Sequence, residues 1–458
     1  MIALTYFAIL LGAVVFFLLS RGRAITTAGG NPAVLHSRPS YHGFYAALVM
    51  LIAGWGSLLA VSWGWLYAID QGLMGEITAQ KPQAPIIEVQ LILSDAKALA
   101  AGTLASQTDA LRQQIAAAFA EQNSLRIWAS MLLSLAVTFG AGFIVYRNIR
   151  PAFRARNKSE RIVEILLWGM AAIAVLTTIG IVLSLIFETI TFFSHIGWRL
   201  DRFLLGTNWS PLSGVQAGKM DPARVGAVPL FVGTFLITLI AMIVAVPIGL
   251  FSAIYLADFA SPGVRAWAKP MLEILAGIPT VVYGFFAALT VAPFLRDTGA
   301  VFGIQIASES ALAAGVVMGI MIIPFISSLS DDVINAVPQS LLDGSYGLGA
   351  TKAETIRLVV LPAALPGIVS AVLLGMSRAI GETMIVVMAA GQGANLTINP
   401  LEAVTTVTVQ IVMLITGDTE ASTAAGPAFT LGFTLFCVTL LMNTIALKIV
   451  RRYREMYD

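Results

Sequence analysis

The chain consists of long apolar stretches that alternate with short polar or basic segments. A helix of about twenty apolar residues is about 30 Å long and crosses the hydrocarbon core of a bilayer. The pattern therefore predicts nine spanning helices, near residues 4–20, 44–67, 126–147, 163–193, 227–257, 271–296, 309–330, 363–390 and 428–449. A further apolar stretch, 401–417, is shorter and rich in threonine, and we expect it to form a re-entrant or interfacial helix.

Composition indicates the same class of protein. Hydrophobic residues make up 58% of the chain, charged residues only 11%, and the mean hydropathy is +0.86. These values are far from those of a soluble domain, so we predict an all-α integral membrane protein. The three histidines and the single cysteine, Cys437, lack the spacing of metal ligands, and we predict neither a metal site nor an internal disulfide.

The lysines and arginines predict how the helices are oriented. They gather at residues 21–38, 146–161 and 448–454, and short basic loops favour the cytoplasmic side of a membrane. With nine spans and an external N-terminus, all three clusters fall in the cytoplasm together with the C-terminus. We interpret the clusters as topological anchors, with recognition of lipid head groups as the alternative.

A basic segment divides the chain into two predicted domains. Residues 1–150 form an N-terminal extension with three spans and an external helical insert at 68–125. Residues 151–458 hold the other six spans. Within them, Gly315 and Gly319 form a small-xxx-small pattern, which predicts close packing against a neighbouring helix.

A cytoplasmic segment at 331–362 connects two of these six spans. Its sequence predicts a helix, a glycine turn and a second helix. Pro338 suits the first turn of a helix, and Gly349 breaks the helical pattern. Thr351 and Glu354 have the spacing of a capping box. Such an amphipathic element is suited to contact another protein.

The same segment resembles the EAA loop of ATP-binding-cassette (ABC) importer permeases. In that loop the residues E-A-A precede a glycine and, further on, a leucine and a proline. The corresponding residues here are Asp343, Gly344, Ser345, Gly349, Leu361 and Pro362. The first three depart from the family pattern, whereas the other three match it in type and spacing. The resemblance implies a type I importer transmembrane domain, in which this loop couples the permease to an ATPase.

Two further segments are similar to phosphate-specific permeases of the PstC type. They read LEILAGIPTVVYGFF (272–286) and PGIVSAVLLGMSRAIGETMIV (366–386), and Met384 favours the PstC type over its partner, the PstA type. The resemblance implies a permease subunit of a phosphate importer in the bacterial inner membrane. Its implied partners are a PstA-type permease, PstB-type ATPases, a periplasmic PstS-type phosphate-binding protein and membrane lipid, with no nucleic acid.

The resemblance also implies that this chain is not itself an enzyme. No G-x-x-x-x-G-K-[ST] phosphate loop occurs in the sequence, so we expect ATP to be bound and hydrolysed on the partner subunits. We expect no cofactor on this chain.

Arg378 and Glu382 are charged residues inside the predicted span 363–390. An arginine near the centre of a spanning helix costs roughly 2.5–3.5 kcal/mol on insertion scales, so it indicates a protein-lined or water-filled path. Glu382 follows four residues later, and we expect it on the same helix face as the partner of Arg378. The resemblance places an anion-path arginine and glutamate at these positions. A structural ion pair that tightens helix packing is the alternative.

Two other functions stay open at this point. A permease for sulfate or molybdate would share the same architecture. A secondary transporter would need its own coupling-ion site, and such proteins often have inverted repeats and broken helices. The residues 277–279 could form such a break, although we expect Pro279 to produce a packed kink. The amphipathic loop and the missing repeat argue against a secondary transporter.

Overall fold

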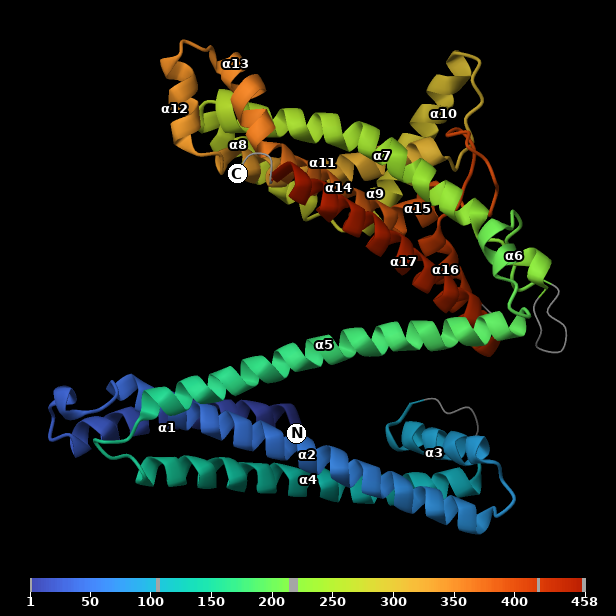
Figure 1. The fold of residues 1–458 in the computed structure, drawn as a ribbon. Coiled ribbons are helices and arrows are strands. Elements are labelled where there is room, and N and C mark those ends of the chain that lie inside the picture. Colours follow the sequence, from blue (N-terminus) through green and yellow to red (C-terminus); the bar gives the residue numbers. More distant parts are fainter. Residues whose placement is uncertain (1, 104–107, 214–220, 418–420, 455–458) are drawn as a thin grey trace. The chain divides into compact units, whose positions relative to one another are not determined.

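The computed structural model describes residues 2–103, 108–213, 221–417 and 421–454 (Figure 1). The chain forms two compact units, residues 1–176 and 177–458, and the boundary between them lies inside helix α5 (Ala155–His195). Every element in the described part is a helix, apart from one isolated bridge between Trp209 and Val225. The predicted all-α fold is confirmed. The predicted domain boundary at 150/151 lies in the loop before α5 and stays a prediction.

Three long helices form the body of the first unit. Its elements are α1 (Ile2–Thr27), η1 (Pro32–Val34), α2 (Pro39–Gln80), α3 (Ile86–Ala100), α4 (Ala110–Arg147) and the first part of α5. Helices α1, α2 and α4 pack against one another. Gly54 of α2 lies at this contact, where an added Cβ would collide with Ile9 and Thr138. A residue without a side chain is therefore needed for the helices to approach so closely.

Helix α2 is too long to lie wholly within a bilayer. Its 42 residues extend about 63 Å, roughly twice the thickness of the hydrocarbon core. The second half of α2 packs with α3 and the start of α4 around a small core of its own, which includes Leu73, Ile92 and Ile115. A buried ion pair joins Asp95 to Arg112 at 2.8 Å in this core. The described residues of the predicted insert are thus helical and folded.

The second unit is centred on the pair α7 and α11. Its elements up to this pair are α6 (Leu200–Leu205), η2 (Pro222–Arg224), α7 (Val228–Ile254), η3 (Tyr255–Phe259), α8 (Pro262–Ala276), α9 (Thr280–Phe286), η4 (Ala287–Val291), α10 (Ala292–Val301) and α11 (Ala311–Asn335). Gly315 and Gly319 face α7, where added Cβ atoms would come within 2.7 Å of Ile240 and 2.8 Å of Val244. The predicted close packing is confirmed.

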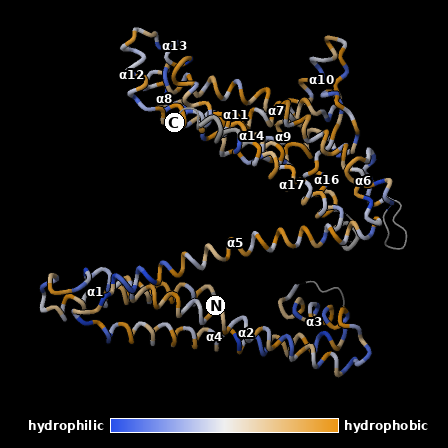
Figure 2. Tube along the Cα trace, viewed as in Figure 1, coloured by the Kyte–Doolittle hydropathy of each residue, from blue (hydrophilic) through white to orange (hydrophobic). Residues whose placement is uncertain are grey.

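The remaining elements return the chain across this core. They are α12 (Gln339–Gly347), α13 (Lys352–Thr355), η5 (Ile356–Val360), α14 (Leu361–Ile380), α15 (Met384–Ala389), α16 (Val407–Thr416) and α17 (Ala421–Arg454). Figure 2 shows the hydrophobic residues along the middle of the long helices, and hydrophilic residues near the start of α5. Helix α16 has ten residues, about 15 Å, and is too short to cross a bilayer.

Eight helices in the described part are long and apolar enough to cross a membrane, and each overlaps a predicted span. The predicted span 363–390 is wrong as a single helix, because α14 ends at Ile380 and α15 begins at Met384. The predicted span 271–296 is wrong as a single helix, because α8 and the run α9–α10 meet at an angle of 88°. Pro279 has no amide hydrogen to donate and disfavours a helical conformation for Ile278. The expected packed kink is therefore a complete break, with Pro279 as the N-cap residue of α9.

Candidate functional site

The candidate site lies where α14 ends. Gly381 is the C-cap residue of α14, and α15 begins at Met384, so the chain leaves the helix between Arg378 and Glu382. The expected i,i+4 arrangement on one helix face is wrong for this pair. Gly381 has a right-handed φ of −86°, and Gly367 and Gly375 lie inside α14, so glycine did not mark this break in the sequence.

The carboxylate of Glu382 caps α15 and does not bind Arg378. It is 9% exposed, and its Oε1 accepts hydrogen bonds from the backbone N–H groups of Met384 at 3.0 Å and Ile385 at 3.4 Å. The carbonyl of Glu382 accepts a hydrogen bond from Thr408 Oγ1 of α16 at 2.9 Å. A negative charge at a helix N-terminus is favourable, so Glu382 fixes both the break and its contact with α16.

Arg378 lies on an open face of α14. The buried face of this helix packs on α11, where a Cβ on Gly375 would lie 3.3 Å from side-chain carbons of Ile322 and Ile326. Arg378 lies off this face and is exposed, as is Leu374 one turn earlier. Within the described residues no hydrogen bond or ion pair ends on the guanidinium of Arg378. Its charge is available to a ligand on that face.

A second helix break lies against the first. Gly284 of α9 touches α15, where an added Cβ would come within 3.1 Å of the Met384 carbonyl oxygen and 2.6 Å of Met388 Sδ. Tyr283 Oη donates a hydrogen bond to the Leu275 carbonyl across the bend between α8 and α9, at 2.8 Å. The two interrupted helices therefore meet beside the residues that follow Glu382.

The predicted coupling residues lie in three places. Asp343, Gly344 and Ser345 are on α12, Gly349 forms the following turn, and Leu361 and Pro362 begin α14. The turn has the predicted geometry, because Gly349 has a φ of +86° and Thr351 and Glu354 form both bonds of a capping box. The predicted helix, turn and helix are confirmed.

The α12 side of this loop exposes apolar side chains. Leu341 is 47% exposed, Tyr346 40% and Leu348 92%. Large apolar side chains gathered on a polar loop indicate a contact with another protein.

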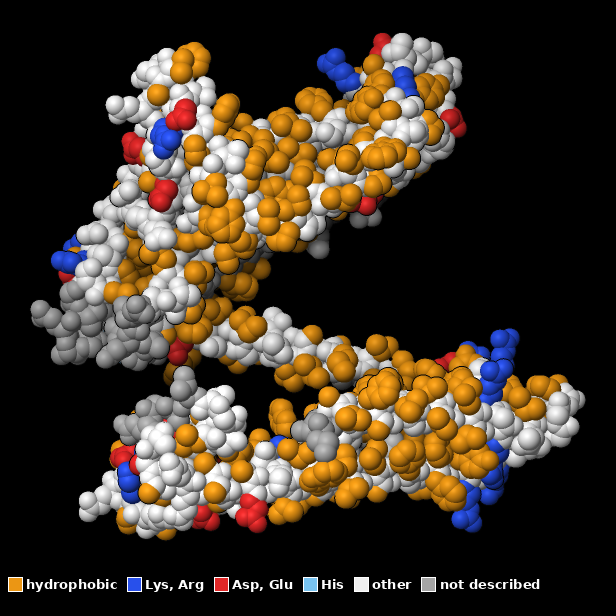
Figure 3. All heavy atoms as spheres, turned by 180° about the vertical axis from the view of Figure 1, so that it is seen from behind, with side chains coloured by type: hydrophobic (Ala, Val, Ile, Leu, Met, Phe, Trp, Pro, Cys, Tyr) orange, Lys and Arg blue, Asp and Glu red, His pale blue; other side chains and the backbone are white. Residues whose placement is uncertain are grey.

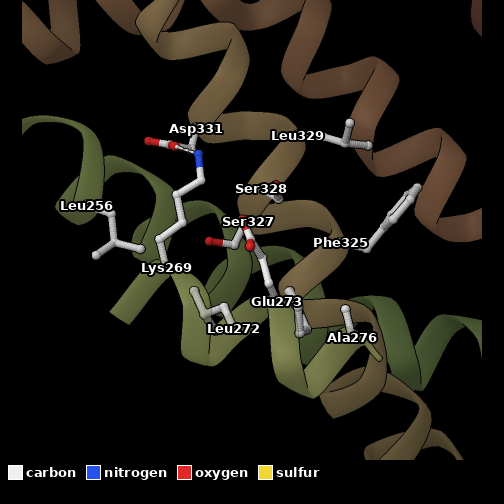
Figure 4. A pocket seen from close by; sticks show the side chains of 11 residues that line it. Leu256, Lys269, Leu272, Glu273, Ala276, Phe325, Ser327, Ser328, Leu329 and Asp331 are labelled. Carbon is white, nitrogen blue, oxygen red and sulfur yellow. Dashed lines mark hydrogen bonds and ion pairs between the residues drawn. The ribbon is translucent and has the colours of Figure 1, made fainter. Parts of the chain in front are cut away.

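A charged cluster that the sequence analysis missed holds α8 to the end of α11. The Asp331 side chain is 4% exposed and accepts hydrogen bonds from Arg265 Nη2 at 3.1 and 3.2 Å and from Lys269 Nζ at 2.8 Å. Asn335 Nδ2 adds a bond at 2.9 Å. Figure 4 shows Lys269 reaching from α8 to Asp331. The i,i+4 spacing of Arg265 and Lys269 was a local signal, but their partner is remote in sequence.

A pocket of about 250 Å³ lies beside this cluster, between α8 and α11 (Figure 4). It is lined by Leu256, Lys269, Leu272, Glu273, Ser327 and Asp331, among others. Neither Arg378 nor Glu382 lines this pocket. The space next to the cluster is therefore separate from the candidate site.

Two known families match consecutive parts of the chain. Residues 6–177 match the family described as phosphate ATP-binding cassette transporter. Residues 245–455 match the family described as binding-protein-dependent transport system inner membrane component. The first match ends within α5, and the second contains Arg378, Glu382 and the α12 loop.

Individual relatives place the chain more closely. The phosphate transport system permease protein PstC of Mesorhizobium japonicum is 30% identical over 308 residues, which cover 62% of this chain and 87% of that protein. The chain belongs to the PstC family of permeases. Another PstC protein, from Xylella fastidiosa, is 33% identical over a match that covers 55% of this chain and 80% of that protein. The probable ABC transporter permease YqgH of Bacillus subtilis is 35% identical over a match that covers 52% of this chain and 74% of that protein.

PstC proteins are transport subunits and not enzymes, and the second family is one of inner-membrane components. This chain is accordingly a multi-pass inner-membrane permease of an ABC importer. Among solved structures, a bacterial ABC transporter that imports alginate matches with a TM-score of 0.44 at 13% identity, over 62% of this chain and 96% of that chain. The MetNI methionine transporter matches with a TM-score of 0.36 at 20% identity, over 50% of this chain and 94% of that chain.

Proposed function

We propose that this PstC-family chain moves inorganic phosphate across the inner membrane as one of two homologous permease subunits. Its partners would be a PstA-type permease, PstB-type ATPases and a PstS-type phosphate-binding protein. The names of its relatives support phosphate as the substrate. The observation that carries the proposal is Arg378, whose exposed guanidinium lies in a spanning helix with no carboxylate bound to it among the described residues.

The chemistry of arginine suits this role. Its planar guanidinium offers a fork of N–H donors that can bind two oxygens of a phosphate at once. The face of α14 that carries Arg378 is uncovered in the single chain, and we place the second permease opposite it. The anion would then pass between the two subunits and be held by Arg378 for part of its path.

Glu382 acts beside the same path in this proposal, though not as a counter-ion. Its carboxylate already accepts two backbone N–H groups of α15 and is largely shielded from solvent. Glu382 therefore keeps the end of α14 in one geometry, which positions Arg378 four residues earlier. The guanidinium needs no release from a bound carboxylate before it meets the anion.

ATP hydrolysis would reach Arg378 through the α12 loop. We place Asp343, Gly344 and Ser345, together with the exposed apolar residues of α12, against an ATPase subunit. The turn at Gly349 and the run α13–η5 connect α12 directly to the start of α14 at Leu361 and Pro362. A shift of α12 therefore reaches the helix that carries Arg378 without passing through another element.

This arrangement also sets the proposed orientation. The ATPases lie in the cytoplasm, so α12 lies on that side, and the C-terminus is cytoplasmic. The N-terminus and the insert at 68–125 would then lie in the periplasm, in agreement with the distribution of basic clusters.

The test is phosphate uptake into liposomes that contain the complete transporter, in which this chain is co-purified with its operon neighbours. Arg378→Lys and Arg378→Gln should each lower uptake roughly ten- to hundredfold, since a hydrogen bond to a charged group contributes about 1.5–3 kcal/mol. Arg21→Gln is the matched control, because Arg21 is also exposed but lies on α1, outside both the proposed path and the coupling loop. Uptake of sulfate in place of phosphate would show that the substrate has been assigned wrongly.

The double variant Arg378→Gln/Glu382→Gln separates the proposed role from a structural ion pair. A structural pair predicts that removing both charges restores much of the uptake lost in either single variant. The geometry described above predicts no such rescue. Normal uptake by Arg378→Gln in an intact complex would exclude Arg378 from the path.

A further inference from the structure

A groove of about 410 Å³ runs between α2 and α5 within the first unit, and we call it the α2–α5 groove. Its lining consists of Tyr41 and Phe44 from α2 and of Ser159, Glu160, Val163, Glu164, Leu167 and Trp168 from α5. Ser159 and Glu160 come first along α5, and Leu167 and Trp168 follow at least about two turns later, with Val163 and Glu164 between them. The groove is therefore polar at the end where both helices begin and apolar further along.

Ser159 is an unusual residue at the polar end. Its side chain is 1% exposed and lines the groove, and its hydroxyl has no hydrogen-bond partner in the described structure. A buried hydroxyl without a partner costs about 1–3 kcal/mol, so such groups normally bind something. The hydroxyl of Ser159 therefore indicates a ligand with a polar group at this depth.

The polar end lies in a strongly basic surrounding. Residues 21–38 and 147–164 together contain nine lysines and arginines against two acidic residues, Glu160 and Glu164. Figure 3 shows blue side chains gathered at this end of the first unit. The two acidic residues line the groove and the nine basic residues surround it, so the positive charge favours an anionic group at the rim of the polar end.

Arg156 brings this charge to the rim of the groove through its contacts with two lining residues, although it does not line the groove itself. Its Nε lies 2.7 Å from Glu160 Oε1, which neutralises that carboxylate, and its guanidinium lies 6.0 Å from the ring of Tyr41. The backbone N–H of Arg156 donates to Ser37 Oγ at 3.2 Å, so the starts of α2 and α5 lie side by side. The N-terminal ends of both helices add partial positive charge at this point.

We propose that the α2–α5 groove binds one anionic glycerophospholipid. Its phosphate would lie beside Arg156, with Ser159 donating its hydroxyl to a phosphate or ester oxygen. An acyl chain would follow Val163, Leu167 and Trp168. The distance from Ser159 to Trp168 along the helix is about 14 Å, which places these residues at head-group and acyl-chain depth in one leaflet.

The properties of the groove favour a lipid over a protein segment. Both of its walls are helices long and apolar enough to span a membrane, and Trp168 is 74% exposed beside it. An occupant must be anionic at one end and apolar along the rest. A phospholipid meets both needs without displacing any contact seen in the first unit.

Fluorescence quenching of Trp168 by brominated lipids tests the proposal in the full-length chain within its assembled complex. The fluorescence of Trp168 is obtained by subtracting the fluorescence of the Trp168→Phe variant from that of the wild type. Dibromo-phosphatidylglycerol, mixed into phosphatidylcholine bilayers, should bind several-fold more strongly than dibromo-phosphatidylcholine or dibromo-phosphatidylethanolamine. Equal quenching by all three lipids would overturn the proposal. No quenching by any of them would show that a protein covers the groove, which also overturns it.

Matched variants distinguish binding of the lipid in the α2–α5 groove from general attraction of anionic lipids to the basic surface around it. Arg156→Gln should lower the preference for phosphatidylglycerol about fivefold or more, whereas Arg150→Gln removes the same charge from a residue that contacts neither Glu160 nor Tyr41 and should change it little. Ser159→Ala should lower it about two- to tenfold with no change in charge. Val163→Phe should fill the groove and abolish the preference without adding a second fluorophore there. Equal effects of the Arg150 and Arg156 variants, with none from Ser159→Ala or Val163→Phe, would reduce the observation to surface charge.

Discussion

The ion cluster at Asp331 should stabilise the second unit measurably. Replacing Asp331 by alanine removes a carboxylate that is 4% exposed and accepts bonds from Arg265, Lys269 and Asn335. Breaking a buried pair by removing one partner typically costs about 3–5 kcal/mol, because the other charge stays buried and unpaired. Arg265 and Lys269 are about one-third exposed here, at 34% and 33%, and can turn toward water. We therefore expect a smaller loss of about 2 kcal/mol.

The neighbouring residue provides the control. Asp332 lies next to Asp331 on α11, but its side chain is 65% exposed and its contact with Lys269 is longer, at 3.6 Å. Asp332→Ala should change the free energy of unfolding by less than about 0.5 kcal/mol. Thermal unfolding of the purified complex in detergent should show a drop of about 4–8 °C in Tm for Asp331→Ala and little change for Asp332→Ala.

The cluster also has a predicted effect on transport. Asp331 lies eight residues before the start of α12, and its basic partners lie on α8, which leads through the bend at 277–279 into α9. Without the cluster, a given displacement of α12 should produce a smaller displacement of α9 and α15. Asp331→Ala should therefore lower the amount of phosphate moved per ATP hydrolysed. If Asp331→Ala matched Asp332→Ala in both Tm and this ratio, the cluster would have neither role.

Three other changes give distinct expectations. Gly349→Val should strain the backbone by about 1–2 kcal/mol, because Gly349 has a φ of +86°, and phosphate uptake should fall. Gly347→Val lies outside the left-handed region and should lower uptake less. Phosphate uptake and the yield of assembled complex are measured for both variants. Glu382→Ala should lower uptake and Tm more than Glu382→Gln, whose amide oxygen can still accept the α15 N–H groups; equal losses would contradict the capping role. Ile86→Cys, in a chain lacking Cys437, should react with an impermeant thiol reagent from the periplasm only, and labelling from the cytoplasm alone would reverse the proposed orientation.

The sequence predicted the long helices well because composition alone decides them. A run of about twenty apolar residues has few alternatives to a spanning helix, since every backbone polar group must be paired within lipid. The turn at Gly349 and the capping box at Thr351 were also predictable, because their signals lie within four residues. Local patterns of this kind do not depend on the rest of the fold.

The geometry around Arg378 and Glu382 was not predicted. The i,i+4 spacing of Arg378 and Glu382 implies a shared helix face only if the helix continues, and α14 ends at Ile380. The break at Pro279 was underestimated in the same way, because a proline inside an apolar run can kink a helix or end it, and the choice depends on tertiary contacts. The Asp331 cluster joins residues more than sixty positions apart, so no local pattern contained it.

The two helix breaks share one physical requirement. Non-helical backbone at membrane depth is tolerated only where its N–H and C=O groups find partners inside the protein. Near the first break Tyr283 Oη donates to the Leu275 carbonyl, and at the second the Glu382 carboxylate and the Thr408 hydroxyl supply partners. Further along, the Gln410 side chain donates to the Gln392 carbonyl at 2.8 Å. These polar side chains hold interrupted backbone, whereas Arg378 holds none among the described residues, which supports the role proposed for it as an anion ligand.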